Sequence, residues 1–224
     1  MTRQTRCALA LLVYAFVGAG CALTSKADRV NVRYFSPPVG ASTGPSADGE
    51  GAPAVDPRTL RMGHVRAADH LRSTIVYQKS DVELGTYDDD FWTERPTDYV
   101  ERAIRAELYQ RRGLTESLSN VDLTLDVQVL AFQEVRRGEK RSARVTLSFT
   151  LHDRGSVTDA SEVSVDVPTK ADGLEGVVTA MGAALRQAVQ ELGDRVDAKV
   201  PAAPAISPSA SPSTSSPTPP PARP

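Results

Sequence analysis

Cysteine is almost missing from this 224-residue chain, which contains only Cys7 and Cys21. Everything after Cys21 therefore lacks a thiol. The folded part can contain neither a disulfide bond nor a metal site built on a cysteine pair. Any fold that forms here must be stable without covalent cross-links.

An excess of positive charge is missing as well. The formal net charge is −2 at pH 7, with 26 Lys and Arg against 28 Asp and Glu. Binding to nucleic acid phosphates requires basic residues clustered on one face. We therefore expect no nucleic acid partner.

The sequence contains no catalytic motif of the common kinds: no Gly-x-Ser-x-Gly turn, no His-Glu-x-x-His helix and no glycine-rich phosphate loop. His64 and His70 are six residues apart and His152 is remote, which favours structural histidines over a zinc site. Asp88–Asp90 lack the spacing and the glycine of a calcium loop, so a solvated turn is the better interpretation. We expect no metal, no cofactor and no enzymatic activity.

The start of the chain carries a clear pattern. Arg3 and Arg6 precede an uncharged apolar stretch, Cys7–Val17, and the small residues Gly18–Gly20 stand directly before Cys21. This order is typical of a secretory signal, and the apolar stretch is too short to span a bilayer. Because the small residues end on a cysteine, the segment resembles a bacterial lipoprotein signal. Residues 1–20 are then removed, and the thiol of Cys21 is lipidated.

An ordinary cysteine, in a signal peptide or an N-terminal membrane helix, is the alternative for Cys21. Gly18 supports it, because lipoprotein signals usually have a larger aliphatic residue at that position. Ala22 rather than Asp follows Cys21, and in lipoproteins this favours transfer to the outer membrane. We expect a protein anchored to the inner leaflet of the outer membrane and facing the periplasm.

Two stretches of biased composition divide the remaining chain. Residues 36–57 are rich in Gly, Ala, Pro and Ser, and residues 201–224 hold nine of the sixteen prolines. Such segments bury too little apolar surface to offset their ordering entropy. We predict a tether over 21–29, one domain over 30–200 with a disordered insertion at 36–57, and a disordered tail over 201–224.

Hydrophobic periodicity predicts the first elements of this domain. Strands are expected at 30–35, 60–65, 75–78 and 82–87, the last two forming a hairpin that ends at Asp88–Asp90. A helix begins at Pro96–Asp98 and ends at Gly113. Its polar face is expected to consist of Glu101, Arg102, Arg105 and Glu107.

The second half predicts three longer strands and a helix. Apolar residues alternate over 121–129, 145–151 and 163–167, with a turn at Arg137–Glu139. An apolar stripe from Leu174 to Val196, with spacings of three and four, predicts an amphipathic helix. The predicted fold class is α+β: an antiparallel sheet with two amphipathic helices packed on it.

Trp92 is the only tryptophan, and it follows Phe91 between the acidic segment and the first helix. One interpretation is a buried plug that seals the hairpin against the helix. The other makes Phe91 and Trp92 an apolar patch that contacts a partner protein or an acyl chain, since tryptophan is enriched at such contacts.

Several segments, taken in order, resemble a known family. They are Val65–Arg72, Ile75–Tyr77, Val82–Tyr87, Trp92–Pro96 and Tyr99–Val100. Over most of residues 60–200 the series is similar to the ABC-type transport auxiliary lipoproteins. The chain differs from that family in the long segment after the first strand and in the Pro-rich tail. The resemblance implies a partner of an Mce-domain protein, a permease and an ATPase, in a system that moves lipids or apolar compounds across the envelope.

A second class of function stays open beside this one. A structural or assembly lipoprotein could link the outer membrane to the cell wall or to another envelope complex, with the tail as its tether. Both classes require no cofactor and place ATP hydrolysis, where there is any, in another subunit. The oligomeric state is left open, and a homo-oligomer fits either class.

Overall fold

The computed structural model describes residues 31–38, 58–119 and 123–201. Contacts divide the chain after Val32, and the unit that begins at Arg33 is the subject here. The predicted signal peptide, Cys21, the tether, residues 39–57 of the insertion and residues 202–224 of the tail lie outside the described residues. Within the described ranges, no helix has the length and apolar character needed to cross a membrane.

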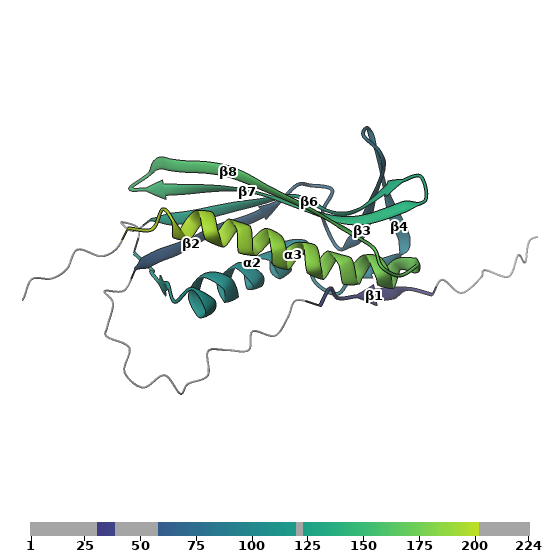
Figure 1. The fold of residues 1–224 in the computed structure, drawn as a ribbon, viewed down its shortest axis with the longest axis horizontal. Coiled ribbons are helices and arrows are strands. Elements are labelled where there is room, and N and C mark those ends of the chain that lie inside the picture. The colour runs from purple at the N-terminus through teal and green to yellow at the C-terminus, as the bar shows by residue number, and fades with distance from the viewer. Residues whose placement is uncertain (1–30, 39–57, 120–122, 202–224) are drawn as a thin grey trace, which may run out of the picture. The chain divides into compact units, whose positions relative to one another are not determined.

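One sheet and two helices make up nearly all of this unit (Figure 1). The strands are β1 (Arg33–Phe35), β2 (Thr59–Ala67), β3 (Thr74–Ser80), β4 (Glu83–Trp92), β5 (Thr115–Glu116), β6 (Thr124–Arg137), β7 (Lys140–Asp153) and β8 (Ser156–Pro168). The helices are α2 (Pro96–Arg105), which continues as the π-helix η2 (Ala106–Arg111), and α3 (Gly173–Asp197). Both helices lie on the same side of the sheet (Figure 1), which confirms the α+β prediction.

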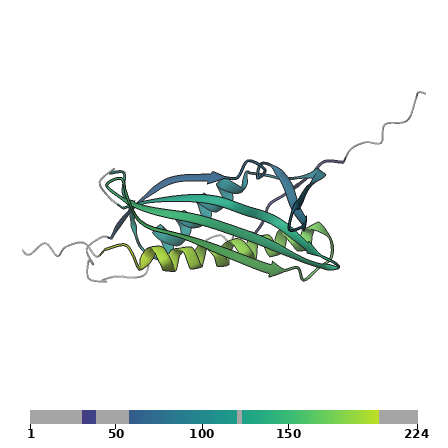
Figure 2. The same cartoon turned by 90° about the horizontal axis from the view of Figure 1, so that it is seen from above.

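The predicted meander of three strands is confirmed. β6 pairs with β7, and β7 with β8, in both cases antiparallel, and α3 runs lengthwise along these strands (Figure 2). Gly138 and Glu139 connect β6 to β7, and Arg154 and Gly155 connect β7 to β8. Gly138, Arg154 and Gly155 have positive φ angles of 62°, 48° and 84°, a conformation that tight hairpin turns use.

The prediction of a purely antiparallel sheet is wrong, because the sheet is mixed. β1 pairs parallel with β4, β5 with β2, and both β2 and β3 with β6. β2 and β3 follow each other along the edge of β6 that β7 leaves free. Parallel partners lie far apart in the sequence and are joined by long connections, so no turn signal marks them.

A β-bulge in β6 decides which of its side chains face the helices. Val129 pairs with Leu147 and Ala131 with Thr146, so Leu130 is an extra residue in the ladder. Such a residue moves the following side chains to the other face of the strand. Beyond the bulge, Phe132 stacks on Tyr99 of α2 with 6.3 Å between ring centroids. Glu134 then turns to the same side, where it is fully buried.

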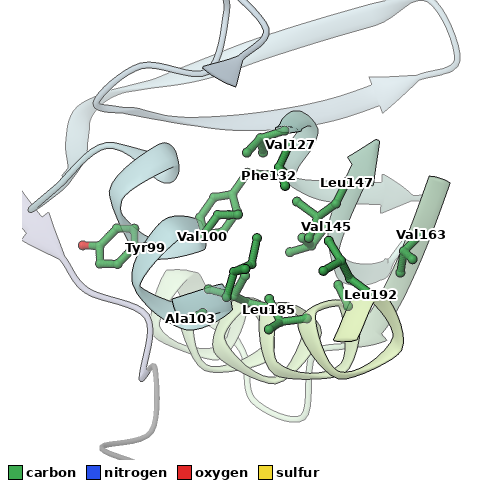
Figure 3. Packing of buried hydrophobic residues seen from close by; sticks show 14 of the residues in the cluster. Tyr99, Val100, Ala103, Val127, Phe132, Val145, Leu147, Val163, Leu185 and Leu192 are labelled. Carbon is green, nitrogen blue, oxygen red and sulfur yellow. The ribbon is translucent and has the colours of Figure 1, made fainter. Parts of the chain in front are cut away.

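Both helices contribute to one apolar core (Figure 3). The apolar stripe of α3 is buried as predicted, and Leu185 and Leu192 point toward Leu147 and Val163 of the meander. This packing fills the space between the sheet and the helices. Surfaces that could contact other molecules therefore lie on the uncovered face of the sheet, at its edges and turns, and on the outer faces of the helices (Figure 1).

Helix α2 begins at Pro96, as predicted, with the backbone N–H of Arg95 donating to Asp98 Oδ2 at 3.4 Å. Gly113, with a φ of 69°, follows η2 and ends the helical segment. Glu107 follows Ala103 and Ile104 at spacings of four and three, so it lies on their buried face of the helix. Its predicted place on the exposed polar face is therefore wrong.

Candidate functional site

Trp92, which the sequence offers as a candidate contact residue, lies in the core. Its side chain is only 2% exposed, and its ring centroid lies 5.3 Å from that of Phe132 and 6.4 Å from that of Tyr99. Both neighbours meet the indole edge-on, an arrangement that aromatic rings favour. The plug interpretation requires this burial. A contact between Trp92 and a partner requires an exposed ring, and the buried position contradicts it.

Phe91 points to the opposite face of β4 and is half-buried. Its ring centroid lies 6.0 Å from that of Tyr34, which is 67% exposed and sits beside Phe91 in the parallel β1–β4 pair. The apolar contact surface predicted for Phe91 and Trp92 is thus reduced to Phe91, and Tyr34 is the residue that accompanies it. We call Tyr34 and Phe91 the edge aromatic pair. Sequence reasoning missed Tyr34 because the pairing of β1 with β4 spans more than fifty residues.

The structure brings two of the three histidines to one carboxylate. His64 Nδ1 lies 3.7 Å from Asp126 Oδ1, and His152 Nε2 lies 3.2 Å from Asp126 Oδ2. His70 is not part of this group. Within the described ranges, no group of three or more histidine, cysteine, aspartate or glutamate side chains has a geometry that could hold a metal ion.

Asp88–Asp90 lie within β4 and form no turn, so the predicted solvated turn is wrong. Asp90 is buried and forms a two-point ion pair with Arg33, with 2.8 Å from Nε to Oδ1 and 3.1 Å from Nη2 to Oδ2. Arg33 also stands next to Asp90 in the β1–β4 pair. Of the three acids, Asp90 therefore holds β1 against the sheet.

A cluster of polar side chains surrounds Glu134 near the β6–β7 turn. We call Glu134, Tyr87, Arg136 and Arg141 the Glu134 cluster. The Tyr87 hydroxyl donates to Glu134 Oε2 at 2.6 Å, Arg136 Nη2 lies 3.0 Å from the same oxygen, and Arg141 Nε donates to Oε1. The Arg136 guanidinium also covers the ring of Tyr77, 3.7 Å from its centroid.

These contacts fix the charge of Glu134. Burial raises the pKa of Glu134, but the hydrogen bonds from Arg141, Arg136 and Tyr87 outweigh burial and hold the pKa below its ordinary value. Burial and the neighbouring Glu134 raise the pKa of the Tyr87 hydroxyl. At neutral pH, Glu134 is therefore an ionised carboxylate held by two guanidinium groups, and Tyr87 is neutral.

A cavity of about 470 Å³ opens beside the Glu134 cluster, between the β6–β7 turn, β1 and the start of α3. Three arginines line it: Arg33, Arg136 and Arg141. Each of them is already paired with a carboxylate, of Asp90 or of Glu134. Arg136 and Arg141 share Glu134, and Glu139, which also lines the cavity, supplies a third acid, so that three carboxylates match the three arginines.

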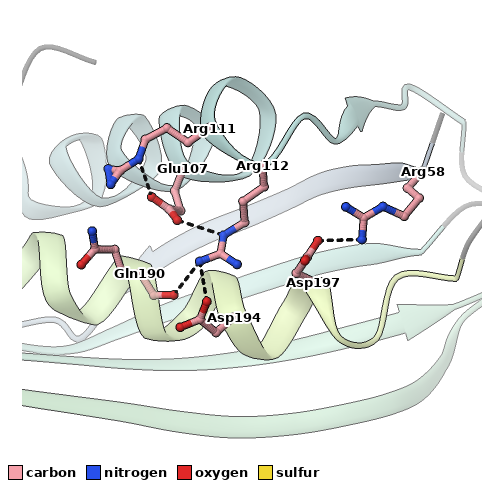
Figure 4. Close-up of polar contacts among 7 residues, drawn as sticks. All are labelled: Arg58, Glu107, Arg111, Arg112, Gln190, Asp194 and Asp197. Atoms are coloured by element: carbon pink, nitrogen blue, oxygen red, sulfur yellow. Dashed lines mark hydrogen bonds and ion pairs between the residues drawn. The ribbon is translucent and has the colours of Figure 1, made fainter. Parts of the chain in front are cut away.

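A second buried carboxylate joins the two helices (Figure 4). Glu107 Oε1 accepts from Arg112 Nε at 2.9 Å, and Glu107 Oε2 lies 3.2 Å from Arg111 Nε. Arg112 Nη2 continues to α3, where it donates to the Gln190 carbonyl at 3.1 Å and to Asp194 Oδ1 at 2.8 Å. Gly193 provides the room, because a Cβ there would lie 2.6 Å from Arg112 Nε. This network links the end of η2 to α3.

A groove of about 350 Å³ runs along the outer side of α3, and we call it the α3 groove. Its floor is formed by small residues at helical spacing, and the end of β8 with the following loop forms one wall. The residues that define it are Gly176, Thr179, Ala180, Ala183, Val167 and Ala171. Pro38 and the charged Lys170, Glu175 and Arg186 also line it.

Two glycines explain why backbone segments cross α3 so closely at this groove. A Cβ on Gly176 would lie 2.1 Å from the Ala171 carbonyl oxygen, and one on Gly182 would lie 2.8 Å from Pro38. Arg186 Nη1 holds the Pro38 segment by donating to its carbonyl at 2.8 Å. The sequence pattern did not reveal the groove, since small residues on a helix signal close packing in general.

The comparisons with known proteins agree with this picture. A family model, described as ABC-type transport auxiliary lipoprotein component, matches residues 43–193. No curated protein matches this chain. The family match confirms the resemblance of the sequence segments to the ABC-type transport auxiliary lipoproteins.

Two crystal structures share the fold. One is of a Xanthomonas campestris protein, with 20% sequence identity and a TM-score of 0.59, covering 74% of this chain and 99% of that one. The other is of an uncharacterized protein, with 17% identity, a TM-score of 0.58 and the same coverage. At such identity, these structures establish the fold alone.

Proposed function

Because the chain belongs to the family of ABC-type transport auxiliary lipoprotein components, we propose that it is a lipid-anchored, non-catalytic component of an Mce-type transport system. The cargo is a lipid or another apolar compound that crosses the cell envelope. The family match over residues 43–193 carries this proposal, since it includes the sheet from β2 onward and nearly all of α3. ATP hydrolysis belongs to another subunit.

The anchor in this proposal is the lipidated Cys21, and the location is the inner leaflet of the outer membrane, facing the periplasm. The basic, apolar and small-residue order before Cys21 supports the anchor, and Ala22 supports the membrane.

The buried acids support a role without catalysis. Asp90, Glu107 and Glu134 are each paired with at least one arginine. A general acid or base works best with a pKa near the working pH, whereas the pKa of Glu134 is lowered away from it. These carboxylates hold elements of the fold together.

The edge aromatic pair is the part of the predicted contact surface that stays accessible. Tyr34 lies in β1, the last strand on its side of the sheet, and Phe91 lies beside it in β4. Aromatic residues are enriched among those that dominate protein interfaces. We assign this pair to the contact with the Mce-domain partner.

A genetic comparison tests the proposed function. Deleting this chain should raise envelope permeability to a hydrophobic dye to the same extent as deleting the associated permease. Because both belong to one pathway, the double deletion should be no worse than either single deletion. Additive defects, or co-sedimentation of the protein with peptidoglycan at normal dye permeability, would favour a structural lipoprotein instead.

A further inference from the structure

We propose that the α3 groove binds the acyl chain of a single-chain anionic lipid, such as a fatty acid, with the headgroup beside Lys170 or Arg186. This ligand class rests on the transport role proposed above. It gives that role a binding site within this chain.

The dimensions of the α3 groove suit one alkyl chain. Its volume of about 350 Å³ lies in the lower part of the range of small-molecule sites, about 300 to 1,000 Å³. From Gly176 to Arg186, α3 rises about 15 Å along its axis. A groove lined over this length accommodates an extended alkyl chain.

The walls of the groove are apolar over most of their area. Val167, Ala171, Ala180 and Ala183 present methyl groups, and Gly176 presents only backbone. Thr179 Oγ1 donates to the Glu175 carbonyl at 2.9 Å. Its hydroxyl is thereby satisfied within the helix, and a ligand here gains by removing apolar surface from water.

The charges at the groove are unbalanced, in contrast to those of the cavity beside the Glu134 cluster. Glu175 Oε1 lies 3.8 Å from Arg33 Nη1, so its ion-pair partner is Arg33 and neither cation of the groove. Among the contacts of the described residues, Lys170 has no ion pair, and Arg186 has only its hydrogen bond to the Pro38 carbonyl. Two cations without carboxylate partners beside an apolar groove are complementary to an anionic headgroup.

The two cations belong to different ends of the groove. Lys170 precedes Ala171, which contacts Gly176, and Arg186 binds Pro38, which contacts Gly182. One carboxylate therefore reaches one of them while the alkyl chain extends toward the other. Substitution of each cation identifies the headgroup end.

Photo-crosslinking of the full-length lipoprotein in proteoliposomes tests the assignment. A dodecanoate that carries a diazirine is the probe, and mass spectrometry maps the labelled residues. We expect labelling within 167–186, and about fivefold less from a diazirine-bearing dodecyltrimethylammonium, in line with the strength of an exposed charge pair. Equal labelling by the cationic probe, or labelling that maps elsewhere, would overturn the inference.

Matched variants separate binding from folding. Thr179→Trp fills the groove and should reduce labelling to background. Gln187→Trp, at an exposed position of the same helix that does not line the groove, should leave labelling unchanged. One of the two variants Lys170→Ala and Arg186→Ala, the one that removes the cation at the headgroup end, should lower labelling about fivefold. Equal labelling of the two tryptophan variants, each with a wild-type melting temperature, contradicts the proposal.

The outcome is distinguishable from a failure of the transport role. If the groove is labelled but no Mce-domain protein associates with the chain, the groove assignment survives and the transport role fails. If that protein associates and the groove stays unlabelled, the groove assignment alone is wrong. If a peptide of this chain or of a partner occupies the groove, the groove likewise stays unlabelled.

Discussion

Replacement of Trp92 by alanine removes the largest fully buried side chain of the core. Removing a buried tryptophan ordinarily destabilises a protein by about 3 to 5 kcal/mol. In this case the indole Nε1 has no hydrogen-bond partner among the described residues, and an unpaired buried N–H already costs some stability. We therefore expect a loss of about 3 kcal/mol, near the lower end of that range.

For a protein of this size, a loss of about 3 kcal/mol lowers the melting temperature by about 6 to 12 °C. Thermal unfolding followed by circular dichroism measures this shift. Trp92→Phe is the matched control, because it keeps an aromatic ring against Tyr99 and Phe132 and removes the unpaired N–H. It should lose less than about 2 kcal/mol.

The opposite pattern would refute the packing described for Trp92. An alanine variant with an unchanged melting temperature and weakened association with the transporter would show that the indole is exposed at an interface. Phe91→Ala separates the two faces of β4. It should reduce partner association with little loss of stability, because Phe91 is only half-buried beside exposed Tyr34.

Three further predictions concern charge, close packing and the tail. In the folded protein the pKa of Glu134 is lowered from 4.5. Its ion pairs therefore stabilise the fold above pH 4.5, and this stabilisation is lost as the pH falls through the lowered pKa. The stability of Glu134→Gln should decline less steeply during acid titration than that of the wild type, and an unchanged decline would contradict the contacts described for the Glu134 cluster. Gly176→Ala places a Cβ 2.1 Å from the Ala171 carbonyl oxygen and should destabilise the protein by about 1 to 3 kcal/mol, whereas Thr179→Ala on the same helix should not, as denaturant titration can show. Truncation after Val200 should leave the melting temperature nearly unchanged, since the Pro-rich tail carries little apolar surface; a drop of several degrees would mean that the tail packs on the domain.

The elements that sequence periodicity predicts are those whose pattern is local. The apolar stripe of α3 from Leu174 to Val196 and the alternation from Val145 to Leu151 are buried as expected. The β6–β7 turn at Gly138 also lies where a glycine between two alternating runs predicts it. Each of these features depends on neighbours within a few residues.

The features that sequence reasoning missed depend on distant partners. Arg33 draws Asp90 into the sheet from a position 57 residues away, so an acidic run that looks like a turn is part of a strand. The bulge at Leu130 rotates Glu134 inward, and no hydrophobic pattern marks that shift. Glu107 lies three residues after Ile104 on the buried face of its helix. A charged residue at either position looks exposed until its arginine partners are known.

Palmitate labelling tests whether the chain carries a lipid anchor. Wild-type protein should incorporate radioactive palmitate, and Cys21→Ser should not, because the thiol of Cys21 is the proposed site of acylation. Label that persists on the variant, or a mature protein that begins at another residue, would contradict the anchor.

Affinity capture of the full-length chain from solubilised envelopes of its own host tests the central claim most directly. Quantitative mass spectrometry should find an Mce-domain protein, with its permease and ATPase, enriched over a capture that uses an unrelated lipoprotein. Phe91→Ala should reduce this enrichment, while the exposed-site control Gln187→Trp should leave it unchanged. Recovery of the chain without any Mce-domain protein would contradict its assignment to a transport system.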